Sequence, residues 1–224
     1  EAEAARFARQ MNLAGVGPAA LDRFRAARVR VVGAGATAGP ALLFLAQAGV
    51  ARIYLDDGAD VTAEDAKAWL YGPDQVGQHR LFAAIEALRG ASALAEVRPH
   101  ATGTLLTATL VCSETEMVAR KAADEARRAG LPHVVALASG DGGEVVAVPI
   151  GAPCFNCASR PAARLPPRRG SAAAVGTLGA LELLLLIAGA VSGGNTGRRI
   201  ELAAGWPKAE PTARNPTCEC RFVH

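Results

Sequence analysis

Four of the five cysteines lie in two close pairs toward the C-terminal end of the chain. Cys154 and Cys157 form a C-x-x-C, and Cys218 and Cys220 form a C-x-C. Two such pairs can supply four thiolates to one tetrahedral zinc ion. Because four protein ligands leave no open coordination position, the pairs predict a structural zinc site rather than a catalytic one.

Two other uses of the cysteines remain open from the sequence. A disulfide within a C-x-C is strained, and cross-linked pairs are rare where thiols are kept reduced. A redox C-x-x-C normally opens a helix after a strand, whereas this one follows Ala152-Pro153 in an expected loop. Both comparisons favour zinc.

A second group of residues has the spacing of a nucleotide-binding turn. Gly33-x-Gly35-x-x-Ala38 follows an apolar stretch, and Asp56 ends the next apolar stretch. Gly33 permits a tight turn, Gly35 lets the backbone approach a phosphate, and small Ala38 lets a helix pack on a strand. Thr37 adds a hydroxyl near the expected helix N-terminus, where anions bind, and the Asp56 carboxylate suits ribose hydroxyls. The turn predicts a nucleotide but does not separate NAD from ATP.

Segments typical of strands and helices alternate around these residues. Strands are expected at 28–32, 51–56, 95–99, 109–112 and 133–138, and helices at 40–48, 78–89 and 117–129. The alternation predicts an α/β fold with a Rossmann-like, mostly parallel sheet and helices on both faces. A later strand at 144–149 is expected to pair antiparallel, followed by a helix at 172–191 and a strand at 199–202.

These elements are expected to form one domain over residues 1–224. We expect a helical arm at 1–28, a nucleotide-binding core at 29–150, and a crossover loop, a helix and a zinc-bound part at 151–224.

Composition narrows the function classes. Half of the 224 residues are hydrophobic and the net charge is only +3, which argues against nucleic acid as a partner. The longest apolar stretch, 178–191, is too short to span a bilayer and contains Glu182. The charged start of the sequence does not look like a signal peptide, so we expect a cytoplasmic protein that binds no membrane.

The order of these motifs resembles that of one protein family. The matching segments are Arg6-Phe-x-Arg9-Gln10, Arg30-Val-Val-Gly-Ala-Gly, residues 47–56, Val76-Gly-Gln-His-Arg80, residues 151–157, Gly176-x-x-Gly179-Ala-Leu-Glu182 and residues 214–218. In this order they are similar to the ubiquitin-activating-enzyme-like adenylyltransferases. The most similar type is the bacterial ThiF/MoeB-like enzymes that activate sulfur-carrier proteins for molybdopterin and thiamine biosynthesis.

The resemblance implies an enzyme that uses ATP with Mg²⁺ and carries a structural Zn²⁺. It would adenylate the C-terminal Gly-Gly tail of a small ubiquitin-like carrier protein and release pyrophosphate. Asp56 would bind the ribose, Arg9 and Arg80 the phosphates, and Glu114 the metal ion, with Lys67 as a further catalytic residue. Such enzymes work as homodimers or heterodimers.

Three departures from the family pattern bear on activity. The family has S-N-x-x-R-Q after the second strand, where this chain, by approximate alignment, has Glu64, Lys67 and Ala68 for the Asn, Arg and Gln. Glu114 replaces a metal-binding Asp with a side chain one methylene longer. The loop at 158–171 has no cysteine, and Cys112 lies in an apolar run where burial is expected, so no enzyme thioester is expected.

Three alternatives stay open. The substitutions at 64, 67, 68 and 114 fit a degenerate, non-catalytic subunit that partners an active enzyme. An NAD-dependent oxidoreductase would need a catalytic acid or base, and none of the four histidines lies in a motif. Adenylation of a small acid or a peptide is the third.

Overall fold

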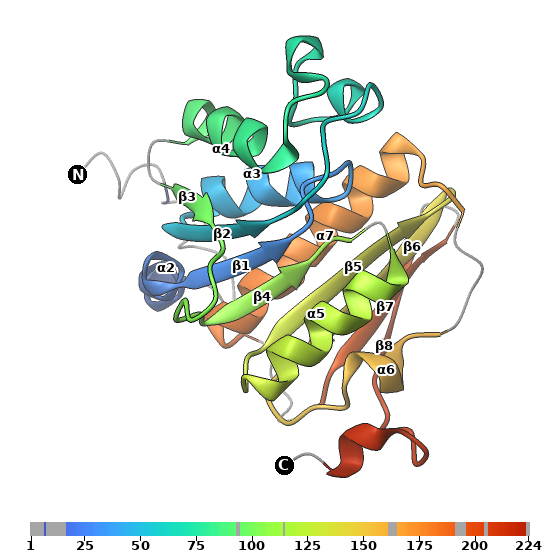
Figure 1. The fold of residues 1–224 in the computed structure, drawn as a ribbon. Helices are drawn as coiled ribbons and strands as arrows, with labels where there is room; N and C mark the ends of the chain where they lie inside the picture. Colours follow the sequence, from blue (N-terminus) through green and yellow to red (C-terminus); the bar gives the residue numbers. More distant parts are fainter. Residues whose placement is uncertain are drawn as a thin grey trace.

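One mixed sheet forms the centre of the molecule (Figure 1). The computed structural model describes Phe7 and residues 17–92, 95–113, 115–160, 165–190, 196–203 and 206–222. The eight strands lie in the order β3-β2-β1-β4-β5-β6-β7-β8. Neighbours from β3 through β5 pair parallel, and neighbours from β5 through β8 pair antiparallel. The strands are β1 (Arg28–Val32), β2 (Arg52–Asp56), β3 (Glu96–Pro99), β4 (Ala108–Val111), β5 (His133–Ser139), β6 (Gly142–Val148), β7 (Arg198–Ala203) and β8 (Trp206–Pro211).

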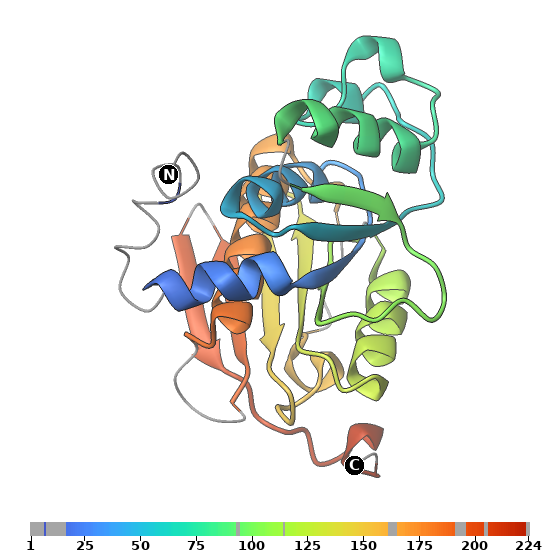
Figure 2. The same ribbon diagram turned by 90° about the vertical axis from the view of Figure 1, so that its left-hand side faces the viewer.

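Helices cover both faces of the sheet (Figures 1 and 2). On one face α2, α3 and α7 share a core with the strands, and α4 packs against α3. On the other face α5 and α6 form a smaller core with β4, β5 and β6. The helices are α2 (Gly17–Ala26), α3 (Ala38–Ala48), α4 (Arg80–Ala91), α5 (Glu116–Arg128), α6 (Phe155–Ala158) and α7 (Arg169–Ala188); short 3₁₀ turns are η1 (Asp65–Lys67), η2 (Pro73–Gln75) and η3 (Glu219–Phe222).

Two glycines let the turn between β1 and α3 pack closely against β4 and α7. Gly33 has φ +98°, and a Cβ there would lie 2.6 Å from the carbonyl oxygen of Cys112 at the end of β4. Gly176 lies in α7, and a Cβ on it would lie 1.9 Å from the carbonyl oxygen of Thr37. The turn is therefore packed between β4 and α7 with no room for a side chain at either glycine.

The predicted fold class is confirmed, and the strand order along the chain is as expected. The helix predicted at 172–191 spans Arg169–Ala188 instead, because Gly189 (φ +68°) ends it with a left-handed turn. The structure also contains β8, which pairs with β7 and was not predicted. Of the predicted arm at 1–28, Phe7 and residues 17–28 are described, and 17–26 are helical.

α7 alone among the described helices is long and apolar enough to cross a membrane by those two measures. Its contacts account for this composition. It packs against α3 and lies along β4, β5 and β6, so its apolar residues form part of the protein core.

Candidate functional site

The glycine turn connects β1 to α3 as expected. The backbone N–H of Gly33 donates to the carbonyl of Asp56 (2.9 Å), and Gly39 N–H donates to the carbonyl of Gly35 (3.0 Å). Thr37 and Ala38 are both buried at the start of α3. The first bond ties the turn to the end of β2, and the second begins the helix.

A cavity of about 390 Å³ lies beside this turn. It opens at the carboxyl ends of β1, β2 and β4. At this point the sheet order changes direction, because β2 and β3 lie on one side of β1 and β4 and β5 lie on the other. Crevices at that position of an α/β sheet bind ligands. Its lining includes the predicted Gly33, Gly35, Asp56 and Arg80, together with Arg30, Asp57, Ser113, Thr115, Lys121 and Glu125.

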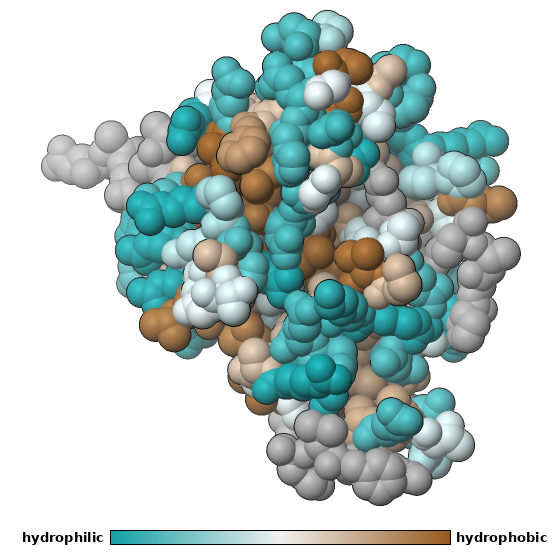
Figure 3. All heavy atoms as spheres, in the orientation of Figure 1, coloured by the Kyte–Doolittle hydropathy of each residue, from teal (hydrophilic) through white to brown (hydrophobic). Residues whose placement is uncertain are grey.

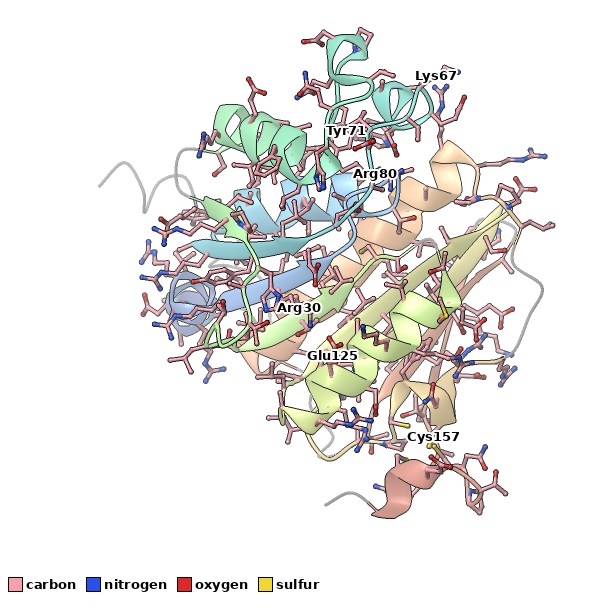
Figure 4. All side chains as sticks on the ribbon, viewed as in Figure 1. Arg30, Lys67, Tyr71, Arg80, Glu125 and Cys157 are labelled. Atoms are coloured by element: carbon pink, nitrogen blue, oxygen red, sulfur yellow. The ribbon has the colours of Figure 1, made fainter. Side chains whose placement is uncertain are left out.

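Asp56 lies in the cavity wall but already has a cationic partner. Its carboxylate accepts a hydrogen bond from Arg30 of β1 at 2.5 Å, and Arg30 also donates to Glu125 of α5 at 2.9 Å. Figure 4 shows Arg30 and Glu125 on facing elements. The imidazole of His100 lies 3.9 Å from Asp56; its burial, and next the nearby Arg30, lower the pKa of His100. The sequence did not indicate this network, because the segment Arg30-Val-Val-Gly-Ala-Gly does not show which carboxylates pair with Arg30.

Arg80 is buried at the first turn of α4 rather than extended into solvent. Its Nε and Nη2 donate to one carboxylate oxygen of Asp65, at 3.0 and 2.7 Å. The same oxygen accepts from the backbone N–H and the hydroxyl of Thr62, both at 2.8 Å. Asp65 is therefore a structural anchor of the segment between β2 and α4.

Asp57 links Arg80 to the glycine turn. Its carboxylate accepts hydrogen bonds from the backbone N–H of Ala34 (2.7 Å) and of Ala59 (2.8 Å). The same carboxylate oxygen that Ala34 reaches lies 3.9 Å from Nη1 of Arg80. Tyr71 also lies against this corner and donates to the carbonyl of Ala34 at 2.7 Å (Figure 4).

Lys67 and Glu64 form a pair of their own on η1. The Lys67 ammonium lies 2.7 Å from the Glu64 carboxylate, and both side chains are exposed. The hydrogen bond from Lys67 lowers the pKa of Glu64. Lys67 does not line the cavity, and Figure 4 places it on the outer side of Arg80. The acidic side chain that turns inward is that of Asp65. The Thr62-x-x-Asp65 spacing is the sequence signal for this arrangement, since Thr and Asp three residues apart close such turns.

Two predicted residues, Arg9 and Glu114, lie outside the described residues. Cys112 directly follows β4 beside the glycine turn and is buried, as predicted. Burial raises the pKa of the Cys112 thiol to about 12. A thiol with that pKa is protonated at neutral pH and is a poor nucleophile.

The four paired cysteines come together near α6, away from the glycine turn, where Figure 4 labels Cys157. Their sulfur atoms all lie within 4.8 Å of one another. Cys154 Sγ lies 3.7 Å from Cys157 Sγ and 3.6 Å from Cys218 Sγ, and Cys157 Sγ lies 3.4 Å from Cys220 Sγ. A tetrahedral zinc with Zn–S bonds of about 2.3 Å places its sulfur atoms about 3.8 Å apart. The residues therefore fit one zinc ion held by Cys154 and Cys157 at α6 and by Cys218 and Cys220 at the start of η3.

The surroundings of the cysteines suit a metal–thiolate group. Burial raises the pKa of the Cys154 and Cys157 thiols, so a metal cation is needed to hold them as thiolates at neutral pH. The polar side of α5 lies beside them, with Arg127 and Arg128 both paired with Asp124. Figure 3 shows mainly hydrophilic side chains over the C-terminal half of this helix. The basic residues that share a hollow with the cysteines are Arg120, Lys121, Arg127 and Arg128.

Comparison with known proteins agrees with this arrangement. The family model described as the ThiF family matches residues 7–220. The chain belongs to the ThiF family. As a member, it combines the family's mostly parallel, Rossmann-like sheet with a cluster of four cysteines that can bind zinc.

Its relatives include longer proteins. Protein HesA, heterocyst, of Trichormus variabilis is 42% identical over 88 residues, which is 39% of this chain and 33% of HesA. Adenylyltransferase and sulfurtransferase MOCS3 of Bos taurus is 33% identical over 168 residues, 69% of this chain and 37% of MOCS3. This ThiF family chain therefore spans about a third of the length of these relatives.

Solved structures share the fold at low sequence identity. MccB of E. coli with MccA superposes with a TM-score of 0.77 and 16% identity, covering 96% of this chain and 73% of MccB. MccB with ATP gives a TM-score of 0.75 and 16% identity over 90% of this chain and 68% of that one. PaaA gives 0.71 and 17% identity, covering 94% of this chain and 73% of PaaA.

Proposed function

We propose that this ThiF family chain catalyses the ATP-dependent adenylation of a C-terminal carboxylate. The substrate would be the Gly-Gly tail of a small ubiquitin-like sulfur-carrier protein. The observation that carries the proposal is the cavity beside the Gly33–Gly35 turn, in a chain of this family. The name of MOCS3, an adenylyltransferase and sulfurtransferase, supports the reaction type. MccB, which has the same fold, has been crystallised with ATP and with MccA.

In the proposed reaction a carboxylate oxygen of the tail attacks the α-phosphorus of ATP. The bond from that phosphorus to the bridging oxygen of the β-phosphate breaks, so acyl-adenylate and pyrophosphate form. We assign the phosphate contact to the backbone at Gly35, next to buried Thr37, and the tight turn that allows it to Gly33. Asp56 is assigned to the ribose hydroxyls and Arg80 to the phosphates, and we expect Arg9 to reach the phosphates as well. Positioning and charge neutralisation supply most of the catalysis in reactions of this kind.

Mg²⁺, when bound with ATP, would neutralise phosphate charge, and we assign its protein ligand to Glu114. Lys67 stays a proposed contributor, although in the structure it lies on η1 outside the cavity. Zinc would have a structural role, holding the tail at Cys218 and Cys220 to α6. We expect the reaction to take place in the cytoplasm, in a homodimer or heterodimer, without nucleic acid or membrane.

The acyl-adenylate would pass to its acceptor without an enzyme thioester. Burial and the raised pKa of Cys112 argue against its use as a nucleophile. Metal binding would occupy the other four cysteines. Residues 158–171 contain none.

ATP–pyrophosphate exchange tests the proposal. We expect label from pyrophosphate to enter ATP only when a carrier ending in Gly-Gly is present. The control carrier lacks the last glycine and should give no exchange. The reaction is refuted if candidate carriers give no exchange although the chain binds ATP.

One observation favours a second function, that of a non-catalytic partner subunit. Arg80, the cation expected at the phosphates, is buried against Asp65 and faces Asp57. In this alternative the chain would not exchange pyrophosphate alone but would bind an active ThiF family enzyme and raise its exchange rate. Co-purification with that enzyme, followed by exchange assays with and without this chain, separates the two functions.

A further inference from the structure

The cysteine cluster, formed by Cys154, Cys157, Cys218 and Cys220, needs positive charge beyond that of a metal ion. Four thiolates outnumber the two positive charges of Zn²⁺, so the proposed zinc site as a whole would be negatively charged. Cys154 and Cys220, one from each pair, are buried. Negative charge in a buried place is costly unless a cation lies near it. A cation beside the cluster would therefore favour the zinc-bound state.

One face of α5 lies against the segment that carries the first cysteine pair. α5 and α6 pack together (Figure 1). Arg120 of α5 donates to the side chain of Asn156, which lies within the C-x-x-C, and its guanidinium lies 5.6 Å from the ring centre of Phe155. Residues seven apart in a helix share a face. Arg127 therefore lies on the same face of α5 as Arg120.

Arg127 is the arginine that this face brings toward the sulfur atoms. Two hollows reach Cys154 and Cys220, and Arg127 lines both. Its side chain is 19% exposed, against 68% for Arg128, which lines the same hollows. The pKa of Arg127 is raised, first by its hydrogen bond to Asp124 and also by the nearby Cys154 and Cys220. The charge of Arg127 is therefore near enough to act on the cluster.

Asp124 fixes the orientation of the Arg127 guanidinium. Its Oδ1 accepts from Nε and Nη2 of Arg127, at 3.1 and 2.7 Å, and its Oδ2 lies 2.5 Å from Nη2 of Arg128. One carboxylate thus meets two guanidinium groups, so positive charge remains in excess. The pair with Asp124 does not use Nη1 of Arg127.

Resting on the proposed zinc site, we propose that Arg127, oriented by Asp124, stabilises the zinc-bound thiolates of the cluster and so raises the affinity of the site for zinc. Groups outside the ligand set that support a metal site typically change its affinity by about 10–100-fold. An arginine in the last turn of a helix also offsets the helix dipole, but that contribution needs no metal. Zinc affinity, measured apart from stability, separates the two roles.

Arg127→Met tests the role, since it removes the charge and keeps an unbranched side chain. Arg128→Met is the matched control, because Arg128 pairs with the same carboxylate but is mostly exposed. Competition with a chromophoric zinc chelator at neutral pH measures the zinc dissociation constant of the full chain. Elemental analysis gives the number of zinc ions bound, and circular dichroism checks that the zinc-loaded variants are folded.

We expect Arg127→Met to raise the zinc dissociation constant about tenfold or more. Arg128→Met should leave it close to the wild-type value. Arg127→Lys should keep most of the wild-type affinity, because it retains the positive charge.

Cobalt(II) in place of zinc reports on the sulfur atoms directly. A cation near a thiolate lowers the energy of its electrons, so charge transfer from sulfur to Co²⁺ needs more energy. Arg127→Met should therefore move the sulfur-to-cobalt absorption band to longer wavelength, and Arg128→Met should not. A residue that only supports the helix would leave this band in place.

Three results would overturn the inference. Wild type and Arg127→Met could have equal zinc dissociation constants, or Arg127→Met and Arg128→Met could raise the constant equally. Arg127→Lys could lose as much affinity as Arg127→Met, which would show that charge is not the cause. Wild-type protein that binds no zinc would refute the proposed zinc site itself and this role with it, whereas zinc binding that does not depend on residue 127 refutes the role of Arg127 alone.

Discussion

Gly176→Ala tests whether α7 positions the nucleotide turn. A Cβ at residue 176 would lie 1.9 Å from the carbonyl oxygen of Thr37 and 3.0 Å from its carbonyl carbon. Both are backbone atoms, so no side-chain rotation can relieve the contact. To reach ordinary van der Waals separation, α7 and the start of α3 must move apart by roughly 1.5 Å.

Two opposing terms set the size of the effect. Alanine in a helix interior is favoured over glycine by about 1 kcal/mol. Overpacking a filled site costs about 1–3 kcal/mol, and a clash with fixed backbone belongs at the upper end of that range. We therefore expect Gly176→Ala to lower the free energy of unfolding by about 2 kcal/mol. We also expect it to weaken nucleotide binding, because Thr37 begins α3 beside the glycine turn.

Gly170→Ala is the matched control in the same helix. A Cβ at Gly170 would meet nothing within 4 Å, so we expect unchanged stability or a gain of up to about 1 kcal/mol. Urea denaturation of both variants measures the difference, and calorimetry with adenosine measures the effect on the site. Equal stabilities for the two variants would show that α7 does not press against the turn, and the reasoning would be wrong.

Three further predictions concern the cysteines and the buried ion pair. Cys157→Ser should reduce zinc, measured by elemental analysis, from about one ion per chain to almost none and should destabilise the fold, because metal binding is coupled to folding; Cys112→Ser should keep the metal. Cys112 should resist iodoacetamide in the folded protein at pH 8 and react after unfolding. The pKa of the Cys112 thiol is about 12 in the folded protein against an ordinary value of 9.0, so the unfolded state loses the proton first. The contribution of Cys112 to the free energy of unfolding should therefore fall as the pH rises above 9.0, which denaturation curves at several pH values measure. Rapid alkylation of Cys112 in the folded protein would contradict both the predicted protection and the predicted pH dependence. Arg80→Met should cost about 3–5 kcal/mol in urea denaturation, because it leaves Asp65 charged, buried and unpaired, whereas Lys67→Met breaks an exposed pair and should leave the denaturation midpoint unchanged; equal effects would refute the distinction.

The parallel half of the sheet could be predicted because its strands are short apolar runs bounded by turn residues. Val29 and Val31 face the core, and Gly33 follows at the point where the chain must turn. β8 could not be predicted in the same way. It is an edge strand with exposed residues along most of its length and with Pro207 and Pro211, so it lacks the alternation of a half-buried strand.

The cysteine site could be predicted because cysteines at such short spacings are typical of metal ligands. The spacing within each pair limits how far apart two sulfur atoms can lie, and a metal needs only that the two pairs meet. The structure places the sulfur atoms within 4.8 Å of one another. Of the proposed nucleotide site, the sequence predicted the turn at Gly33 and Gly35, which the structure places between β1 and α3.

The charged side chains of the proposed nucleotide site form pairs that no local sequence pattern indicates. Glu64 and Asp65 are adjacent acids, yet only Asp65 turns inward, because Thr62 closes a turn on it and Arg80 approaches from α4. Arg80 matched a family position, but its burial depends on the path of the whole segment between β2 and α4. Residue type alone therefore places a cation at the site without showing how much of its charge a ligand can use.

The same pairing fixes how the segment between β2 and α4 is held. Asp65 and Arg80 hold it from within, and Asp57 holds the glycine turn to it. Both contacts link residues that are far apart in the sequence, Arg80 to Asp65 and Ala34 to Asp57. The position of the Arg80 guanidinium beside the cavity therefore depends on the folding of the whole segment, and the sequence near Arg80 does not determine it.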